Sequence, residues 1–149
     1  MESMEARMVK LYARNNNHVA LHAIPGHFAT SHSHINFYID MTSLKTRANE
    51  AQEVAKSLAG DYVNSTVVDT IVCMDGTEVV GAYLAQEFEK RGFRNTNLHD
   101  TIYVVTPEYN ANNQLIFRDN TIPAIKGKNV ILLLATTTTG LTVRRSLEC

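Results

Sequence analysis

The sequence has few cysteines, no charge bias and no long apolar run, and each shortage excludes a class of protein. Two cysteines, Cys73 and Cys149, are too few for a disulfide framework. The 14 basic side chains nearly cancel the 15 acidic ones and form no basic stripe, which argues against a nucleic-acid or membrane-surface binder. No apolar run approaches a membrane span, and the first residues lack a signal-peptide pattern. We therefore expect a reduced, cytoplasmic protein that contacts neither nucleic acid nor membrane.

What the chain does have is enough apolar material for one core. Its 149 residues are too few for two ordinary domains, and 44% of them are hydrophobic, as in soluble globular proteins. Repeats, low-complexity tracts and linkers are absent from the sequence. We therefore expect a single domain over residues 1–149.

Apolar periodicity predicts helices and strands in alternation. The expected helices cover residues 4–14, 44–59, 77–91 and 141–147, and the expected strands cover 35–41, 69–74, 101–105, 114–117 and 130–135. Ser43 is expected to cap the second helix and Gly60 to end it. Helices that alternate with short apolar strands favour an α/β fold, a mostly parallel sheet flanked by helices.

The most informative segment is 129–142, which reads N-V-I-L-L-L-A-T-T-T-T-G-L-T. Residues 130–135 have the length of a buried strand, and four threonines and Gly140 separate them from a possible helix. Backbone N–H groups and threonine hydroxyls of such a loop can donate to a phosphate, the helix start adds partial positive charge, and Gly140 permits close approach. The segment predicts a phosphate site, with an ordinary strand-to-helix turn as the alternative.

A second strand-to-helix turn follows the strand at 69–74. It consists of Met74, Asp75, Gly76 and Thr77. Ligands of parallel sheets bind at the carboxyl ends of strands, so the two turns together form a candidate site. The alternative is that Asp75 or Thr77 caps the following helix. Cys73 lies in an apolar strand without a histidine nearby in sequence, so we expect an inert buried thiol.

Three segments resemble the type I phosphoribosyltransferases, and among them the orotate phosphoribosyltransferases. The first runs from Gly26 and Phe28 to Asp40 and is similar to the family's N-terminal G-h-F, S-G-x-x-S and Y-x-D pattern. The second, M-D-G-T at 74–77, stands where the family has its pyrophosphate loop. The third, T-T-G-L-T at 138–142, matches the end of the family's motif for phosphoribosyl diphosphate (PRPP).

The resemblance implies transfer of phosphoribosyl from PRPP to orotate or a related base with release of pyrophosphate, as in pyrimidine biosynthesis. The implied site residues are Thr138, Thr139, Gly140 and Thr142 for the 5′-phosphate, Met74, Asp75, Gly76 and Thr77 for pyrophosphate, and Thr30, Ser31, His32, Ser33 and His34 for the base. The resemblance also implies a Mg²⁺ cofactor with Asp75 as its ligand, and a homodimer that binds PRPP and orotate or a nucleotide. Such catalysis rests on positioning and charge stabilisation, and no catalytic residue is singled out.

The sequence departs from the family pattern in three places. Leu134 and Ala135 stand where the family has two acidic residues that hold the ribose hydroxyls. Segment 106–113, at the position of the mobile catalytic loop, contains no cation that could stabilise departing pyrophosphate. The chain stops at Cys149, whereas the family continues into further strands. We therefore expect a fold without the C-terminal strands, either a fragment or a fold that a partner chain completes.

These departures leave other functions open. One is a phosphoribosyltransferase-fold protein, catalytically impaired, that binds or senses a nucleotide or sugar phosphate. Another is an assembly subunit whose missing strands come from a partner. A zinc site is a further alternative, because five histidines lie within 17 positions: His18, His22, His27, His32 and His34. Zinc usually takes about four ligands at defined spacings, so we expect most of these histidines to be surface residues.

Overall fold

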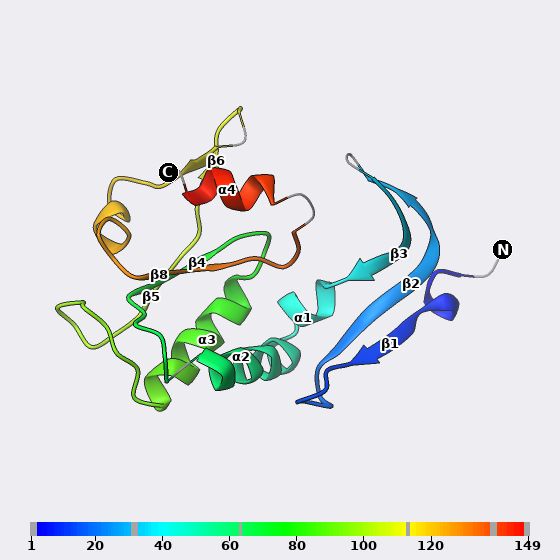
Figure 1. Cartoon of the computed structure of the whole chain (residues 1–149), viewed down its shortest axis with the longest axis horizontal. Helices are drawn as coiled ribbons and strands as arrows, with labels where there is room; N and C mark the ends of the chain where they lie inside the picture. The colour runs from blue at the N-terminus through cyan, green and yellow to red at the C-terminus, as the bar shows by residue number, and fades with distance from the viewer. Residues whose placement is uncertain (1–2, 31–32, 63, 113, 138–139, 148–149) are drawn as a thin grey trace.

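A three-stranded parallel sheet forms the centre of the molecule (Figure 1). The structure, a computed structural model, describes residues 3–30, 33–62, 64–112, 114–137 and 140–147. The strand order of the central sheet is β5 (Tyr103–Val105), β4 (Thr70–Cys73) and β8 (Val130–Leu133), with β4 parallel to both neighbours. Helices surround this sheet, so the predicted α/β class with a parallel sheet is confirmed.

Two helices, α2 (Ala48–Tyr62) and α3 (Glu78–Lys90), cover one face of the sheet (Figure 1). Ala51, Ala55 and Ala59 recur along one side of α2 and are fully buried, since small side chains let helices approach closely. Phe88 of α3 and Ile71 of β4 are the largest side chains of the apolar cluster on this face. The main core of the molecule therefore lies between α2, α3 and the sheet.

The opposite face carries smaller elements. They are the antiparallel hairpin of β6 (Glu108–Tyr109) and β7 (Leu115–Ile116), the 3₁₀ turn η2 (Ile122–Ala124) and the helix α4 (Leu141–Leu147). Here Val72, Met74 and Leu115 form a second buried cluster. Side chains alternate across a strand, so Ile71 and Cys73 point to the first cluster and Val72 and Met74 to the second.

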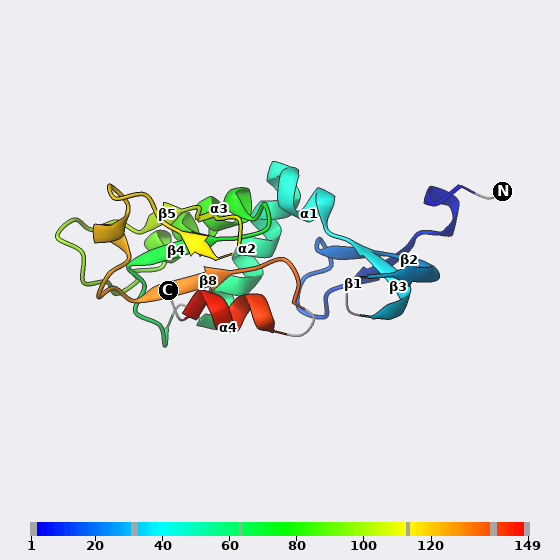
Figure 2. The ribbon, with the colours of Figure 1, turned by 90° about the horizontal axis from the view of Figure 1, so that it is seen from above.

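A separate antiparallel sheet precedes the core in sequence and stands beside it (Figures 1 and 2). Its strands are β1 (Val9–Tyr12), β2 (Ala20–Ala29) and β3 (His34–Asp40), and the turn η1 (Glu5–Arg7) precedes them. The predicted helix at 4–14 is therefore wrong apart from that turn, and β2 was not predicted. The short segment pairs as a strand because β2 offers it a partner, with Leu11 opposite Leu21.

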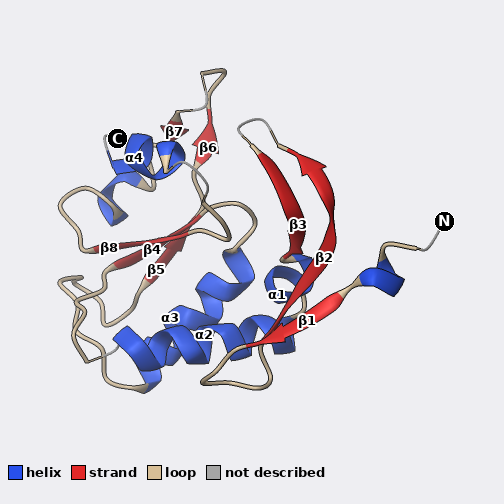
Figure 3. Ribbon diagram, turned by 45° about the vertical axis from the view of Figure 1, so that its right-hand side comes forward, coloured by secondary structure: helices blue, strands red, loops and turns tan. Residues whose placement is uncertain are grey.

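The short helix α1 (Thr42–Thr46) joins this sheet to the core (Figure 3). Asp40 accepts a hydrogen bond from the backbone N–H of Thr42 (2.9 Å), and Ser43 makes no capping bond, so the expected cap at Ser43 is wrong. Arg47 adopts an extended backbone and separates α1 from α2, which splits the predicted helix 44–59 in two. That helix also continues through Gly60 to Tyr62, because Gly60 does not take a left-handed conformation.

The remaining predicted elements lie close to their observed places. The predicted strands at 35–41, 69–74, 101–105 and 114–117 appear as β3, β4, β5 and β7, and the predicted helices at 77–91 and 141–147 appear as α3 and α4. The strand predicted at 130–135 appears as β8, which ends at Leu133, but β8 is at the edge of its sheet and Val130 is 40% exposed, so it is not a buried strand. None of the described helices has the length and apolar character needed to cross a membrane.

The amino end of the sheet is held by one buried carboxylate, that of Asp69. It accepts hydrogen bonds from the backbone N–H and hydroxyl of Thr96 (hydroxyl 2.9 Å) and from the backbone N–H (2.7 Å) and side-chain amide (2.8 Å) of Asn129. Burial by itself raises the pKa of Asp69. The four hydrogen bonds lower it by more, so the pKa falls from its ordinary value of 3.8 to about 2. Asp69 therefore ties the start of β4 to the segments that precede β5 and β8.

Candidate functional site

A left-handed turn follows β4 at its carboxyl end, on the side of the core that faces the N-terminal sheet (Figures 1 and 2). Asp75 has φ of 56° and Gly76 has φ of 75°, and Asp75 is the one described residue besides glycine with positive φ. Aspartate tolerates this conformation better than most side chains, and glycine adopts it without steric cost. The turn leaves Asp75 and Gly76 exposed at the edge where ligands of parallel sheets bind.

A cation reaches this turn from another part of the chain. The ammonium of Lys45, on α1, donates a hydrogen bond to the backbone carbonyl of Asp75 (2.8 Å). Lys45 Nζ also lies 3.8 Å from the place a β-carbon on Gly76 would occupy. Lys45 therefore joins α1 to the turn and places a positive charge beside it.

Tyr109 on the β6–β7 hairpin lies within electrostatic range of the same turn. Burial raises the pKa of Tyr109, and the negative charge of Asp75 raises it further. Tyr109 lies on β6, in the segment predicted to replace the mobile catalytic loop. Three segments far apart in sequence thus bring Lys45, Asp75 and Tyr109 to the carboxyl end of β4.

The other two residues of the predicted pyrophosphate loop, Met74 and Thr77, are buried. The hydroxyl of Thr77 lies 2.7 Å from the carbonyl oxygen of Met74 and 3.2 Å from that of Leu133, and the N–H of Met74 donates to Leu133 (2.9 Å). Thr77 is the N-cap residue of α3, as the capping alternative has it, but its side chain makes no capping hydrogen bond. Its hydroxyl instead fixes the end of β4 against the end of β8.

The second predicted loop joins β8 to α4. Thr138 and Thr139 lie outside the described residues, and Thr142 falls in the first turn of α4. Gly140 has φ of 73°, and a β-carbon placed on it would meet nothing within 4 Å. A larger residue at Gly140 would therefore act through backbone strain, not through a clash with the protein.

The two positions without acids also lie at this end of β8. Leu134 packs against the apolar cluster of Val72, Met74 and Leu115. Ala135 is half-buried and carries no polar group. Neither side chain can accept a hydrogen bond, and the packing of Leu134 provides a structural reason for an apolar residue there.

The described residues of the predicted base-binding segment lie where β2 ends and β3 begins. Ser31 and His32 lie outside the described residues. The exposed hydroxyl of Thr30 donates to the carbonyl of Ser33 (2.8 Å) and accepts from its N–H (2.9 Å), which closes the turn. His34 begins β3 and contacts His27 across the hairpin, 2.9 Å between ring nitrogens.

Sequence reasoning missed Lys45 and Tyr109. A lysine on an amphipathic helix is ordinarily a solvated charge, and nothing in the sequence separates Lys45 from the other lysines. Tyr109 lies in a polar, turn-rich segment just before the predicted strand at 114–117, and the sequence gives it no distinguishing signal. Only the tertiary fold brings Lys45 into contact with the turn and Tyr109 within electrostatic range of it.

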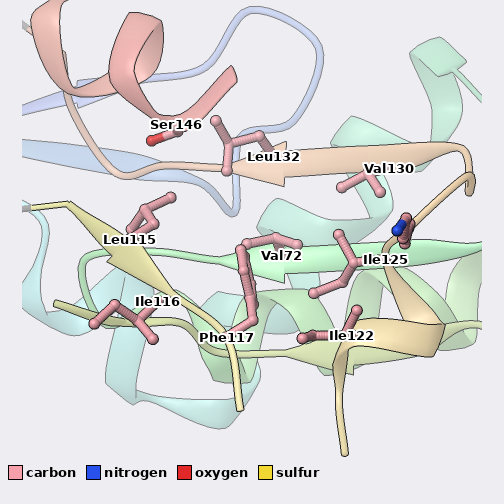
Figure 4. Close-up of a pocket in the computed structure, with 10 residues that line it drawn as sticks. Val72, Leu115, Ile116, Phe117, Ile122, Ile125, Val130, Leu132 and Ser146 are labelled. Atoms are coloured by element: carbon pink, nitrogen blue, oxygen red, sulfur yellow. The ribbon is translucent and has the colours of Figure 1, made fainter. Parts of the chain in front are cut away.

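A pocket of about 680 Å³ lies away from this site, between the sheet, the β6–β7 hairpin, η2 and α4 (Figure 4). It is lined by Val72, Leu115, Ile116, Phe117, Ile122, Ile125, Lys126, Val130, Leu132 and Ser146. A smaller pocket of about 270 Å³ lies on the other face of β8 and shares Leu132 with the first. The mainly apolar lining of both suits an apolar group better than a phosphate, and none of the predicted site residues lines them.

Two other predicted features have clear places in the structure. Cys73 is fully buried, as predicted, and burial together with the charge of Glu78 raises its pKa to about 11, which favours the protonated thiol. Among the described residues, no group of three or more His, Cys, Asp or Glu side chains could hold a metal ion. A zinc centre of the usual protein-ligated kind is therefore absent from the described part of the histidine cluster.

The fold can be compared with known proteins. No family model and no curated protein matches the sequence. A solved structure that the chain resembles is the orotate phosphoribosyltransferase of Mycobacterium tuberculosis H37Rv, in complex with Fe(III) dicitrate. The TM-score is 0.52 at 13% sequence identity, and the match covers 86% of this chain and 68% of that one. The chain therefore has an α/β fold of the type I phosphoribosyltransferase kind.

Proposed function

We propose that this chain is an orotate-type phosphoribosyltransferase that binds PRPP at the carboxyl ends of β4 and β8 and passes its phosphoribosyl group to orotate or a related base. The observation that carries the proposal is the contact between Lys45 and the Asp75 carbonyl (2.8 Å) at an exposed left-handed turn. This contact puts the Lys45 ammonium at the carboxyl edge of the parallel sheet, where ligands of such sheets bind. The sequence motif at 138–142 supplies the second support.

In this proposal the two loops bind different phosphate groups of PRPP. The loop with Thr138, Thr139, Gly140 and Thr142 binds the 5′-phosphate, and the turn of Asp75 and Gly76 faces the diphosphate. The ammonium of Lys45 provides positive charge that segment 106–113 lacks, because preorganised cations stabilise charge that develops on a departing diphosphate. The buried residues Met74 and Thr77 hold the turn in place, because the Thr77 hydroxyl contacts the carbonyl oxygens of Met74 and Leu133.

A magnesium ion fits this site as a companion of the substrate. Asp75 exposes one carboxylate, and among the described residues it accepts no hydrogen bond from the protein. Mg²⁺ is commonly held by one or two carboxylates together with substrate phosphates, so one free carboxylate is a sufficient protein share. When bound, the ion would neutralise diphosphate charge, and Asp75 would hold it on the protein.

A second candidate function is binding of PRPP or a nucleotide without turnover, and one observation favours it. Leu134 packs into an apolar cluster where the resembling family has a carboxylate for the ribose. A hydrogen bond to a charged group contributes about 1.5–3 kcal/mol, so two missing carboxylates would weaken ribose binding by roughly 10²–10⁴-fold. Such a protein would retain the phosphate contacts and lose the ribose contacts that position the reacting carbon.

Phosphorus NMR separates these functions. The chain is mixed with PRPP and Mg²⁺, and spectra are recorded before and after orotate is added. Pyrophosphate that forms only with orotate establishes the transferase. Shifted or broadened PRPP signals without pyrophosphate establish binding without turnover, and unchanged PRPP signals contradict both.

Replacement of Lys45 by methionine tests the contact that carries the proposal. Methionine keeps much of the aliphatic side chain and removes the charge, so we expect about tenfold weaker PRPP binding, the lower end of what a charge-assisted contact contributes. The matched control is Lys10→Met on the exposed strand β1, which should bind PRPP as the wild type does. Equal affinities of the Lys45 variant and the control would remove Lys45 from the site.

A further inference from the structure

Two exposed histidines meet on the β2–β3 hairpin. Nε2 of His27 lies 2.9 Å from Nδ1 of His34, and the ring centroids are 4.9 Å apart with the ring planes tilted by 32°. The residues come from different strands, His27 from β2 and His34 from the start of β3. Their ring nitrogens therefore converge although the residues are seven positions apart in sequence.

A bulge in β2 produces this meeting. Pro25 pairs with Phe37, but the next pairs are Phe28 with Ile35 and Ala29 with His34, so β2 contains one residue more than β3 in this interval. A bulge re-aims the side chains next to it. His27 lies inside the irregular interval and contacts His34 although Ala29 is the backbone partner of His34.

The separation of the two nitrogens suits a shared metal ion. Imidazole nitrogens bind divalent transition metals at about 2.0–2.1 Å, so two of them lie about 2.9 Å apart at a right angle and about 3.3 Å apart at a tetrahedral angle. In the structure this 2.9 Å contact is a hydrogen bond between the two rings, so an ion would displace the shared proton and the rings would turn toward it. The nitrogens themselves are already at the separation that the right angle of a square-planar or octahedral ion requires. A tetrahedral ion would require the rings to separate by a few tenths of an ångström.

We propose that His27 and His34 form a two-histidine site for a divalent transition-metal ion, with Cu²⁺ and Ni²⁺ bound ahead of Zn²⁺. Imidazole suits all three ions, and the order follows both the right-angle geometry and the general rise of affinity toward copper. No third His, Cys, Asp or Glu joins the pair among the described residues, so water completes the coordination at this exposed position. His34 also belongs to the segment implied to border the base, but the test of the metal site uses neither PRPP nor orotate.

Calorimetric titration of the chain, prepared without a histidine tag, with Ni²⁺ tests the pair. We compare the wild type with His27→Ala and His34→Ala. Loss of an outer-shell partner of a metal ligand alone typically weakens metal binding by about 10–100-fold, so loss of a direct ligand should weaken it at least about tenfold. His99→Ala, which removes an exposed histidine far along the chain, is the matched control and should titrate as the wild type. Wild-type affinity in His27→Ala, or an equal loss in His99→Ala, would overturn the proposal.

Paramagnetic broadening locates the ion independently of affinity. Substoichiometric Cu²⁺ is added to isotope-labelled chain, and we expect the imidazole signals of His27 and His34 and the amides around the β-bulge to broaden first. The unchanged core methyl signals of His27→Ala and His34→Ala would show that both variants fold. Broadening that centres on His18, His22 or His99 would assign the ion elsewhere and overturn the proposal.

Discussion

Two aspartates stand at opposite ends of β4 and have opposite surroundings. Asp69, just before the strand, is 0% exposed and accepts four hydrogen bonds from Thr96 and Asn129. Asp75, two residues after Cys73 ends the strand, is exposed, has a left-handed backbone and accepts no hydrogen bond through its carboxylate within the described residues. The same residue type thus serves the folded state at one end of the strand and remains available to a ligand at the other.

The difference between the two ends follows from what each end has to satisfy. At the amino end the segments before β4, β5 and β8 converge, and the buried Asp69 carboxylate accepts hydrogen bonds from the backbone N–H groups of Thr96 and Asn129. At the carboxyl end the turn after β4 stays at the surface, where Lys45 donates a hydrogen bond to it and Tyr109 lies within electrostatic range of Asp75. Stability and ligand binding are therefore expected to respond to different substitutions.

The largest expected effect is at the amino end. Asp69→Ala removes the buried carboxylate that accepts four hydrogen bonds from Thr96 and Asn129. A hydrogen bond to a charged group contributes about 1.5–3 kcal/mol, so we expect the free energy of unfolding to fall by about 3–5 kcal/mol. Urea denaturation measures the change. Asp119→Ala, at an exposed position, is the control and should stay within about 0.5 kcal/mol of the wild type. An equally small change in the Asp69 variant would show that the network is not needed for stability.

The next largest effect is the pH dependence of the stability that Asp69 contributes. The pKa of Asp69 is about 2 in the folded chain, below its ordinary value of 3.8, so the unfolded chain takes up a proton first as the pH falls. Asp69 therefore contributes roughly 2 kcal/mol above the unfolded pKa, and this contribution disappears as the pH falls from about 5 to about 2. Denaturation of the wild type and of Asp69→Asn across this range should show their difference shrinking. A difference that stays constant with pH would contradict the assignment.

The smallest effects are at the carboxyl end. Gly76→Ala places a β-carbon on a backbone with φ of 75°, so we expect a loss of about 1 kcal/mol of stability. Asp75→Gly removes a β-carbon from a left-handed position, so the chain should keep its stability or gain up to about 1 kcal/mol, while PRPP binding weakens. Thermal unfolding and PRPP titration of both variants check this pair. A clear loss of stability in Asp75→Gly would show that the Asp75 side chain supports the fold.

The sequence predicted the elements whose signal is local. The strand β4 and the helix α3 followed from an apolar run, a turn and a basic C-terminal turn within about twenty residues. The turn of Asp75 and Gly76 followed from its composition, and the inert character of Cys73 from its apolar neighbours. The resemblance to type I phosphoribosyltransferases gave the fold class, which the structure and the similarity to a solved orotate phosphoribosyltransferase support.

The sequence misjudged segments that depend on a distant partner. Residues 9–12 have a spacing that suits a helix, but they lie opposite residues 20–23 of β2 and form a strand. Residues 130–135 have the apolar composition of a buried strand, but β8 has a neighbour on one side only within the described sheet. In both cases the conformation or burial of the segment is decided by which strand it pairs with.

Sequence alone determined the α/β pattern, the central strand and the turn of Asp75 and Gly76, because hydrophobic periodicity and turn composition act within a few residues. Tertiary structure alone decided that Asp69 gathers three segments, that Lys45 and Tyr109 reach the turn of Asp75, and that a bulge brings His27 to His34. Those contacts join residues far apart in the chain, and their geometry depends on strand register and helix packing, which no local pattern contains.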